Sequence, residues 1–421
     1  MQENSEFFYH ILPNNLKIAH HSLQSPVSYV GLMVGAGTRD EHAQENGIAH
    51  YIEHCVFKGT VRHTASQIIR NIEGTGGEVN AYTTKEETTF YAATLTEHLA
   101  MTLRLILEMV FTPTFPKEET DKERAVILDE IETYNDSPSE LIYDDFEALV
   151  FNGHSLAMPI LGTRKSLRHI SSKPDIALQW MQNHYHTDRM VIFYEGNMRA
   201  EQFVRLVERE LSHLPVPLSY STEYNFSHSR LPITDTIATP HTASYRRHTH
   251  QVHVMLGQRA FPLGHELQLP LYLLNNILGG GSLNARLNMA LREKEGLVYT
   301  IDSTYTPFSD TGYWATYFAC DPDEVQHCLN LVYGELKKMI DAPLSESQLH
   351  SALNQLRGQM AIAAENRENS ALAMAKSVLH RGYAQSWQQV FAQIASTTPD
   401  ILQAAAQAVL EPSALFLLKY E

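Results

Sequence analysis

The sequence predicts an α+β fold made of two similar halves, each a largely antiparallel β-sheet packed with α-helices. The chain has 421 residues, which is more than one ordinary hydrophobic core accommodates, so two or more domains are expected. Extended runs such as "VSYVGLMVGAG" and "QVHVMLGQ" are mixed with long amphipathic helices. Because the strands do not alternate one for one with helices, a doubly wound parallel sheet is less favoured.

The same order of predicted elements occurs twice along the chain. In the first half, "FYAATLTEHLAMTLRLILEMV" leads through a proline-containing turn to "KEETDKERAVILDEIE"; in the second, "YFACDPDEVQHCLNLVYGELKKMI" leads to "DAPLSESQLHSALNQLRGQM". A glycine-bearing extended segment precedes each of them, "GTGGEVNAYTT" and "KEGLVYTIDSTY". The stretch between the halves is rich in Pro, Ser and Thr and has little helical periodicity. We therefore predict halves at 1–212 and 243–421, joined by a linker at 213–242.

Composition and charge exclude several classes of protein. Apolar residues make up 43% of the chain and no apolar run is long enough to span a bilayer, so no membrane association is expected. The formal net charge of -16 opposes binding to nucleic acid. The N-terminal residues carry no secretory or transit pattern, so a cytoplasmic location is expected. The three cysteines are interpreted as small buried hydrophobic residues.

The stretch "GIAHYIEHCVFK" at residues 47–58 contains the pattern His50-x-x-Glu53-His54. It is typical of a helix that ends near Gly59, with one face formed by the apolar residues Ile48, Ile52, Cys55 and Val56. On the opposite face, two imidazoles at i and i+4 lie one turn apart and can converge on a single ion such as zinc. The alternative is a solvated face with polar residues placed by chance, in a chain that has 22 histidines.

A catalytic zinc needs a third protein ligand, and Glu130 is the candidate. The segment "KERAVILDEIETY" has an apolar stripe at helical spacing, formed by Ile127, Ile131 and Tyr134. Glu123 and Glu130 fall on the same stripe. A carboxylate on a core-facing stripe is costly unless it is paired or binds a metal, which Glu130 as ligand and Glu123 as an orienting group would satisfy. The alternative is that both side chains reach solvent at the helix edge.

These residues resemble the inverzincin zinc metallopeptidases, the family of pitrilysin, insulin-degrading enzyme and the mitochondrial processing peptidase, and especially its short bacterial members. The resemblance extends over nearly the whole chain. The run "GGEVNAYTTKEETTFY" is similar to the family's substrate-binding edge strand, and "LNARLNMALREKEGLVYT" is similar to its arginine and tyrosine element. The implied fold is the processing-peptidase-like metallohydrolase architecture, with tandem halves.

The resemblance implies a zinc endopeptidase. His50, His54 and Glu130 would be the metal ligands, Glu53 would activate the zinc-bound water, and Glu123 would support the site. One Zn²⁺ per chain is expected, because the stretch of the second half that aligns with the motif, "LYLLNNILG", contains no His or acidic residue.

The resemblance also implies how a peptide substrate is held. Asn80 and Ala81 would bind an oligopeptide or an unstructured polypeptide segment as an added edge strand. Tyr299 would donate its hydroxyl to the developing oxyanion, and Arg292 would hold the substrate backbone or its terminus. Because family members enclose the peptide in a clamshell chamber of two half-pairs, a chain with only two halves is expected to form a homodimer. The sequence leaves open whether Arg292 and Tyr299 act in cis or on the partner chain.

A second class of function stays open at this point. The family includes members that kept the fold and lost the chemistry, so the chain could be a catalytically retired, regulatory or scaffold subunit of a processing-peptidase-like complex. A third possibility is an active subunit that needs a different chain to complete its chamber. The enzyme is favoured because the full set is present, namely His50, Glu53, His54, Glu130, Arg292 and Tyr299.

Overall fold

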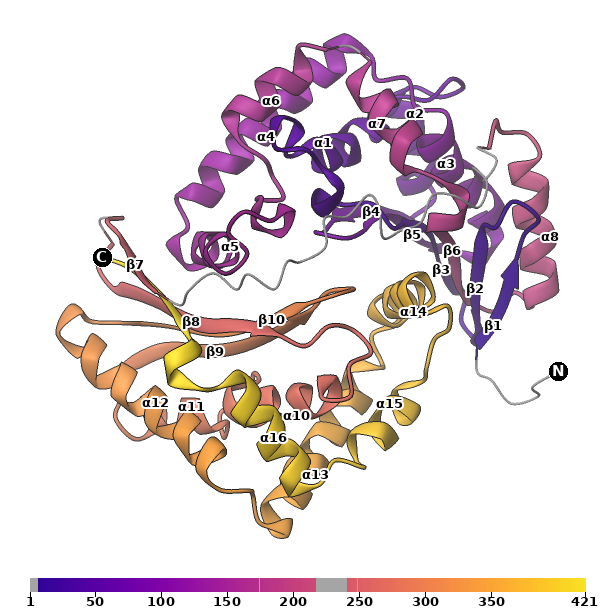
Figure 1. The fold of residues 1–421 in the computed structure, drawn as a ribbon. Helices are drawn as coiled ribbons and strands as arrows, with labels where there is room; N and C mark the ends of the chain where they lie inside the picture. Colours follow the sequence, from indigo (N-terminus) through magenta and orange to yellow (C-terminus); the bar gives the residue numbers. More distant parts are fainter. Residues whose placement is uncertain (1–6, 174, 217–240, 248) are drawn as a thin grey trace. The chain divides into compact units, whose positions relative to one another are not determined.

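The computed structural model describes residues 7–173, 175–216, 241–247 and 249–421. They form two compact units, each with its own β-sheet (Figure 1). Unit 1 is drawn from Met1–Glu132, Met158–Leu231 and Ala363–Ser386, and unit 2 from Thr133–Ala157, Pro232–Ile362 and Trp387–Glu421. Most of the predicted linker at 213–242 lies outside the described residues, which break off after 216 and resume at 241.

Unit 1 contains a six-stranded sheet in the order β1-β2-β6-β3-β5-β4. Its strands are β1 (Phe7–Ile11), β2 (Lys17–Ser22), β3 (Val27–Val34), β4 (Glu78–Thr83), β5 (Thr88–Leu95) and β6 (Met190–Gly196). Neighbouring strands are antiparallel, except that β2 runs parallel to β6. Because β4 pairs within the sheet with β5 alone, it forms one edge.

Both faces of this sheet are covered by helices. Along β6, Ile192 and Tyr194 join one hydrophobic cluster while Val191 and Phe193 join another, as the alternation of side chains along a strand requires. The first face is covered by α1 (Ile48–Cys55), α2 (Ala65–Glu73), α3 (Leu99–Phe111), α4 (Lys117–Asn135), α6 (Arg164–Ser171), α7 (Ile176–His184) and α8 (Ala200–Leu211). The second face is covered by α14 (Arg367–Arg381), which Figure 1 colours orange-yellow.

Unit 2 repeats this plan with a five-stranded sheet in the order β7-β11-β8-β10-β9. Its strands are β7 (Thr242–Tyr245), β8 (Val252–Ala260), β9 (Val298–Pro307), β10 (Gly312–Cys320) and β11 (Phe416–Tyr420). Only β7 and β11 pair in parallel. The helices of unit 2 are α5 (Pro138–Val150), α10 (Gln268–Gly279), α11 (Arg286–Asn288), α12 (Val325–Asp341), α13 (Glu346–Ala363), α15 (Trp387–Ile394) and α16 (Pro399–Val409). The predicted α+β fold with two similar, largely antiparallel halves is confirmed.

The compact units differ from the contiguous halves 1–212 and 243–421 at two places. The segment Thr133–Ala157, with α5, belongs to unit 2, and the segment Ala363–Ser386, with α14, belongs to unit 1. Each of these helices covers one face of the sheet built by the other half of the sequence. The physical reason is that an apolar stripe specifies only that a helix is buried, and does not specify against which sheet.

No helix among the described residues is long and apolar enough to cross a membrane. Cys55, Cys320 and Cys328 are buried and free, as the sequence predicts. Cys55 lies on the apolar face of α1 and packs in the core of unit 1.

Candidate active site

Helix α1 carries the His50-x-x-Glu53-His54 pattern and is fixed at its N-terminal end. Gly47 precedes the helix with φ +91°, a left-handed conformation that favours glycine, and a Cβ there would come within 2.8 Å of Gly162. The buried Glu41 carboxylate accepts hydrogen bonds from the backbone N–H groups of Gly47 (2.7 Å) and Ala49 (2.9 Å). These two bonds satisfy backbone N–H groups at the start of the helix, and burial raises the pKa of Glu41 to about 8. The first turn of α1 is therefore held rigidly.

The predicted face pattern of this helix is observed. The residues fully removed from solvent on its apolar side are Ile48, Ile52, Cys55 and Val56. After α1 the chain continues as one 3-10 turn, η3 (Val56–Lys58), and then leaves the helical conformation at Gly59. The core contacts thus orient the opposite side, with His50, Glu53 and His54, toward α4 and β4.

Three donor atoms from α1 and α4 converge on one point. The Oε2 atom of Glu130 lies 3.7 Å from Nε2 of His50 and 3.6 Å from Nε2 of His54. These separations exceed a hydrogen bond, but donors about 2.0 to 2.2 Å from one tetrahedral ion lie roughly 3.3 to 3.6 Å apart. The arrangement therefore fits a zinc ion. Among the described residues, these three form the one such group of His, Cys, Asp and Glu ligands.

The protonation state of His50 suits a metal ligand. Its side chain is buried, and within the described part of the chain its Nδ1 atom has no hydrogen-bond partner. Burial, and secondly the neighbouring His54, lower the pKa of His50 to about 3. The imidazole is therefore neutral at physiological pH, which is the form that coordinates metals.

The far side of His54 is supported by a carboxylate. Oε2 of Glu123 lies 3.1 Å from Nδ1 of His54, and the ammonium group of Lys58 lies 2.8 Å from the other carboxylate oxygen. A ligand histidine whose second nitrogen is bonded to a carboxylate has a fixed tautomer and ring orientation. Glu123 thus lies where the sequence predicts an orienting carboxylate. Lys58 in turn pairs with Glu123.

The placement of the two glutamates on α4 corrects one expectation. The Glu123 side chain is 12% exposed, whereas the Glu130 side chain is 43% exposed. Glu130 is therefore not on the core-facing stripe formed by Ile127 and Ile131. At 100° per residue it is offset by about 60° from Ile127, which places it at the helix edge where it reaches both the histidines and solvent. An open side suits a site that must admit a substrate.

Glu53 lies beside the histidines and is bonded to strand β4. Its Oε2 atom accepts a hydrogen bond of 2.6 Å from the hydroxyl of Thr83. Partial burial raises the pKa of Glu53, although the Thr83 hydrogen bond and the charge of His54 act in the opposite direction. A raised pKa favours a carboxylate that exchanges a proton.

Asn80 and Ala81 lie on β4, one of the two edge strands of the sheet in unit 1, as the predicted substrate strand requires. They pair with Tyr91 and Phe90 of β5. The Asn80 side chain is exposed, while Ala81 packs against the core under α1. Because β4 has no second neighbour among the described strands, its outer backbone groups can pair with an extended peptide.

Arg292 and Tyr299 lie together in unit 2. Arg292 belongs to η7 (Met289–Glu293), a short π-helical turn, and Tyr299 is the second residue of the edge strand β9 and is 81% exposed. The Arg292 guanidinium stacks 5.6 Å from the centre of the Tyr299 ring. π-helical turns are frequent at functional sites, and an exposed tyrosine is available to a ligand. The histidine and glutamate group lies in unit 1, so the two predicted sets belong to different units.

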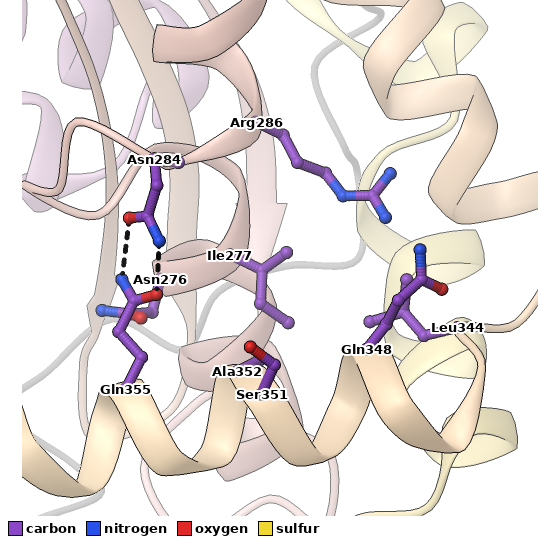
Figure 2. A pocket seen from close by; sticks show the side chains of 10 residues that line it. Asn276, Ile277, Asn284, Arg286, Leu344, Gln348, Ser351, Ala352 and Gln355 are labelled. Atoms are coloured by element: carbon purple, nitrogen blue, oxygen red, sulfur yellow. Dashed lines mark hydrogen bonds between the residues drawn. The ribbon is translucent and has the colours of Figure 1, made fainter.

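A separate pocket of about 200 Å³ lies in unit 2 between α10, α11 and α13. Figure 2 shows the Asn284 and Gln355 amides facing each other across it, joined by two hydrogen bonds of 2.9 and 3.2 Å. Gln359 on the same helix bonds Asn276 and Ser282. These amides fasten the glycine-rich segment after α10 to α13, so we assign the pocket a structural role.

Sequence reasoning missed three residues of the site, namely Glu41, Lys58 and Thr83. Glu41 could be recognised as a carboxylate preceding a helix start, although its distance from Gly47 is unusual for a cap. Thr83 could be found from the alternation of β4, because it shares a face with Ala81. Lys58 gives no signal in the sequence, since its partner Glu123 lies on another helix.

The fold and this group define a two-sheet α+β protein with a candidate metal centre on its first unit. Residues 17–164 match the family profile described as insulinase (peptidase family M16), and residues 173–356 match the profile described as peptidase M16 inactive domain. The chain belongs to the insulinase family, peptidase family M16. This family confirms the resemblance seen in the sequence.

Relatives agree with this family assignment, and solved structures agree with the fold. The chain is 31% identical to the uncharacterised zinc protease YmxG of Bacillus subtilis over 84% of this chain and 83% of the relative. It is 31% identical to the uncharacterised zinc protease SCO5738 of Streptomyces coelicolor over 95% and 86%. A crystal structure of a protease from Helicobacter pylori has a TM-score of 0.90 at 18% identity, covering 99% of both chains. A peptidase M16 inactive domain structure from Pseudomonas fluorescens has a TM-score of 0.84 at 18% identity, covering 99% and 98%.

Proposed function

We propose that this protein is a zinc-dependent endopeptidase that cleaves oligopeptides or unstructured polypeptide segments. The observation that carries this proposal is the convergence of His50, His54 and Glu130 on one point, with Glu53 beside them. Membership of a peptidase family with relatives named as zinc proteases supports the same reaction.

His50, His54 and Glu130 hold one zinc ion per chain. When bound, the ion supplies Lewis-acid polarisation of the scissile carbonyl and of the attacking water. The neutral His50 and the single negative charge of Glu130 leave the centre with a net positive charge. Glu123 and Lys58 keep the His54 ring in its ligand orientation through the contact on Nδ1.

Glu53 is the general base. It accepts the proton of the attacking water and passes it to the leaving amine, and such positioned proton transfer contributes roughly 10² to 10⁴ in rate. The Thr83 hydroxyl occupies only Oε2 of the carboxylate. The other oxygen is left for the proton.

The peptide is held as an extended strand on the outer edge of β4, with Asn80 and Ala81 in contact with it. Main-chain hydrogen bonds supply affinity in this mode and make cleavage broad in sequence. Arg292 holds the substrate backbone or terminus and Tyr299 donates its hydroxyl to the oxyanion. We propose a homodimer that encloses the peptide, with these two residues acting either in cis or across it.

Residues 173–356 match a profile described as an inactive domain, so a non-catalytic subunit is the second candidate. The sequence of the second half contains no His-x-x-Glu-His pattern, whereas the first half contains His50, Glu53, His54 and Glu130. In our proposal, unit 1 carries the metal ligands and the general base, and unit 2 lacks them and supplies substrate contacts.

The test is substitution of Glu53 by Gln. We expect Glu53→Gln to retain about one zinc per chain and to lose cleavage of a quenched fluorescent peptide by at least roughly 100-fold, because the proton acceptor is removed while the ligands remain. Metal content is measured by plasma mass spectrometry on the same preparations.

Glu73→Gln is the matched control, because Glu73 is an exposed glutamate on α2. It should behave as the wild type. Near-normal turnover in Glu53→Gln would exclude Glu53 as the base, and a zinc-loaded wild type without cleavage of any peptide would favour the non-catalytic subunit.

A further inference from the structure

The side chains of β4 divide between the two faces of the sheet. Val79 and Ala81 pack against the core that contains α1, while Tyr82 packs in the cluster that contains α14. Because alternate residues share a face, Thr83 is the next side chain in the row that begins with Val79 and Ala81. It differs from them in carrying a hydroxyl. The last residue of the edge strand thus directs a polar group toward α1.

That hydroxyl is bonded to Glu53. The Oγ1 atom of Thr83 donates to Oε2 of Glu53 at 2.6 Å, a short bond of the kind made to a charged acceptor. Within the described part of the chain, it is the one hydrogen bond to this carboxylate. The backbone of Thr83 is itself fixed, because it pairs with Thr88 at the end of the β4 and β5 ladder. The donor is therefore more rigid than the glutamate it holds.

A glutamate side chain has three rotatable bonds, and its carboxylate is poorly located unless something ties it. A β-branched residue on a strand has few χ1 rotamers, so Thr83 is a stiff anchor. Ala81, two residues earlier on the same strand, is a proposed substrate contact. The strand that would set the register of the peptide is thus the strand that fixes the carboxylate.

We propose that Thr83 is a positioning residue, which fixes the Glu53 carboxylate relative to the edge strand on which the peptide lies. This inference rests on the proposed function. Through this bond, β4 positions both the carboxylate that activates the attacking water and the peptide that carries the scissile bond. A misplacement of about 1 Å between reacting groups costs roughly 100-fold in rate, so the bond matters for the chemical step more than for binding.

The test compares one substitution that removes the hydroxyl with one that keeps it. Thr83→Val keeps the shape and removes the donor, and Thr83→Ser keeps the donor. We expect kcat of zinc-loaded Thr83→Val to fall roughly 10- to 100-fold, with KM within about threefold of wild type and zinc content unchanged. Thr83→Ser should keep kcat within about fivefold of wild type, because the hydroxyl restores the bond.

A second measurement does not depend on activity. In crystal structures of the two variants, the Glu53 carboxylate should leave its wild-type rotamer or occupy several rotamers in Thr83→Val, and should keep the wild-type rotamer in Thr83→Ser. A loss of kcat below fivefold in Thr83→Val, or a loss expressed in KM alone, or an unmoved carboxylate would overturn the inference. Equal damage in Thr83→Ser would also overturn it.

The two proposals fail in distinguishable ways. A wild-type protein that binds zinc and cleaves no peptide contradicts the proposed function, and the crystallographic comparison still tests the bond. A wild-type protein that cleaves peptides with Thr83→Val equally active contradicts only the positioning role.

Discussion

Glu123 shows how one side chain that touches no substrate can tune a site. Its Oε2 atom lies 3.1 Å from Nδ1 of His54, and its other carboxylate oxygen forms an ion pair with Lys58. We predict that Glu123→Ala weakens zinc affinity about 10- to 100-fold, because His54 loses the contact that fixes its tautomer and ring orientation. Competition with a fluorescent chelator measures the affinity.

Glu119→Ala is the control for this prediction, since Glu119 lies one turn away on α4 and pairs with Lys122 on the surface. Its zinc affinity should equal that of the wild type. The same affinity for all three proteins would mean that Glu123 does not support the metal ligand.

At the residue scale, helical spacing predicts that His50, Glu53 and His54 share one face, whereas Glu130 is predicted from the apolar stripe of a separate segment and from the family resemblance. The prediction that Glu130 lies on the core-facing stripe is wrong. A residue that is offset by 60° from a buried neighbour can lie on the buried or on the exposed side of the helix edge. Thr83 was missed because its role depends on a contact between a strand and a helix that are 30 positions apart in the chain. The alternation of β4 predicts the face on which Thr83 lies, but it does not predict which residue of α1 it contacts.

At the scale of single elements, the anchoring of α14 is the clearest case of stability that depends on charge. The helix buries Ala371, Met374, Ala375 and Val378 against the sheet of unit 1. At its edge, Lys376 and His380 both bond the buried carboxylate of Glu87 in the turn between β4 and β5. The element is therefore joined to the sheet by apolar contacts and by one charged cluster.

This cluster predicts a pH dependence. Burial by itself raises the pKa of Glu87, but the hydrogen bond from His380 and the charge of Lys376 outweigh it and lower the value from 4.5 to about 2. A depressed carboxyl pKa stabilises the folded state above the unfolded pKa, so this contribution is complete above about pH 4.5 and is lost as the pH falls toward 2. The shift corresponds to roughly 3 kcal/mol of unfolding free energy at most.

Urea unfolding of the wild type and of Glu87→Gln between pH 2.5 and 6 measures this contribution. The wild type should lose stability more steeply with falling pH than Glu87→Gln, because glutamine does not titrate. Parallel curves for the two proteins would show that the ion pairs do not persist in solution.

At the scale of the whole molecule, the exchange of two segments between the sequence halves dominates the architecture. The sequence predicted the repeat, the α+β class and the two sheets, because these follow from local patterns. It could not predict that α5 and α14 cover the sheet of the other half, since the apolar stripe of α14 would fit either sheet. Contiguous halves at 1–212 and 243–421 were therefore the simplest interpretation.

The exchange predicts where a core substitution is felt. Met374→Ala removes a side chain that is 3% exposed and should cost roughly 2 to 5 kcal/mol. Although residue 374 lies late in the sequence, we expect faster hydrogen exchange in β3 and β6 of unit 1, with β8 and β10 of unit 2 unchanged. Mass spectrometry of peptic fragments resolves the four strands.

Leu336→Ala on α12 is the matched substitution, because Leu336 is fully buried in the core of unit 2. It should accelerate exchange in β8 and β10 and leave β3 and β6 protected. If Met374→Ala acted on the strands of unit 2 instead, α14 would belong to that unit.

The late position of α14 also governs how the protein emerges from the ribosome. The last strand of the first sheet ends at Gly196, and α14 begins at Arg367, about 170 residues later. At translation speeds of about 5 to 20 residues per second, α14 is synthesised roughly 10 to 30 s after the last strand of the sheet. The apolar face that α14 covers is exposed during this time. Nascent chains halted before residue 367 should therefore bind holding chaperones. The chaperones should dissociate when α14, the yellow-orange helix of Figure 1, emerges.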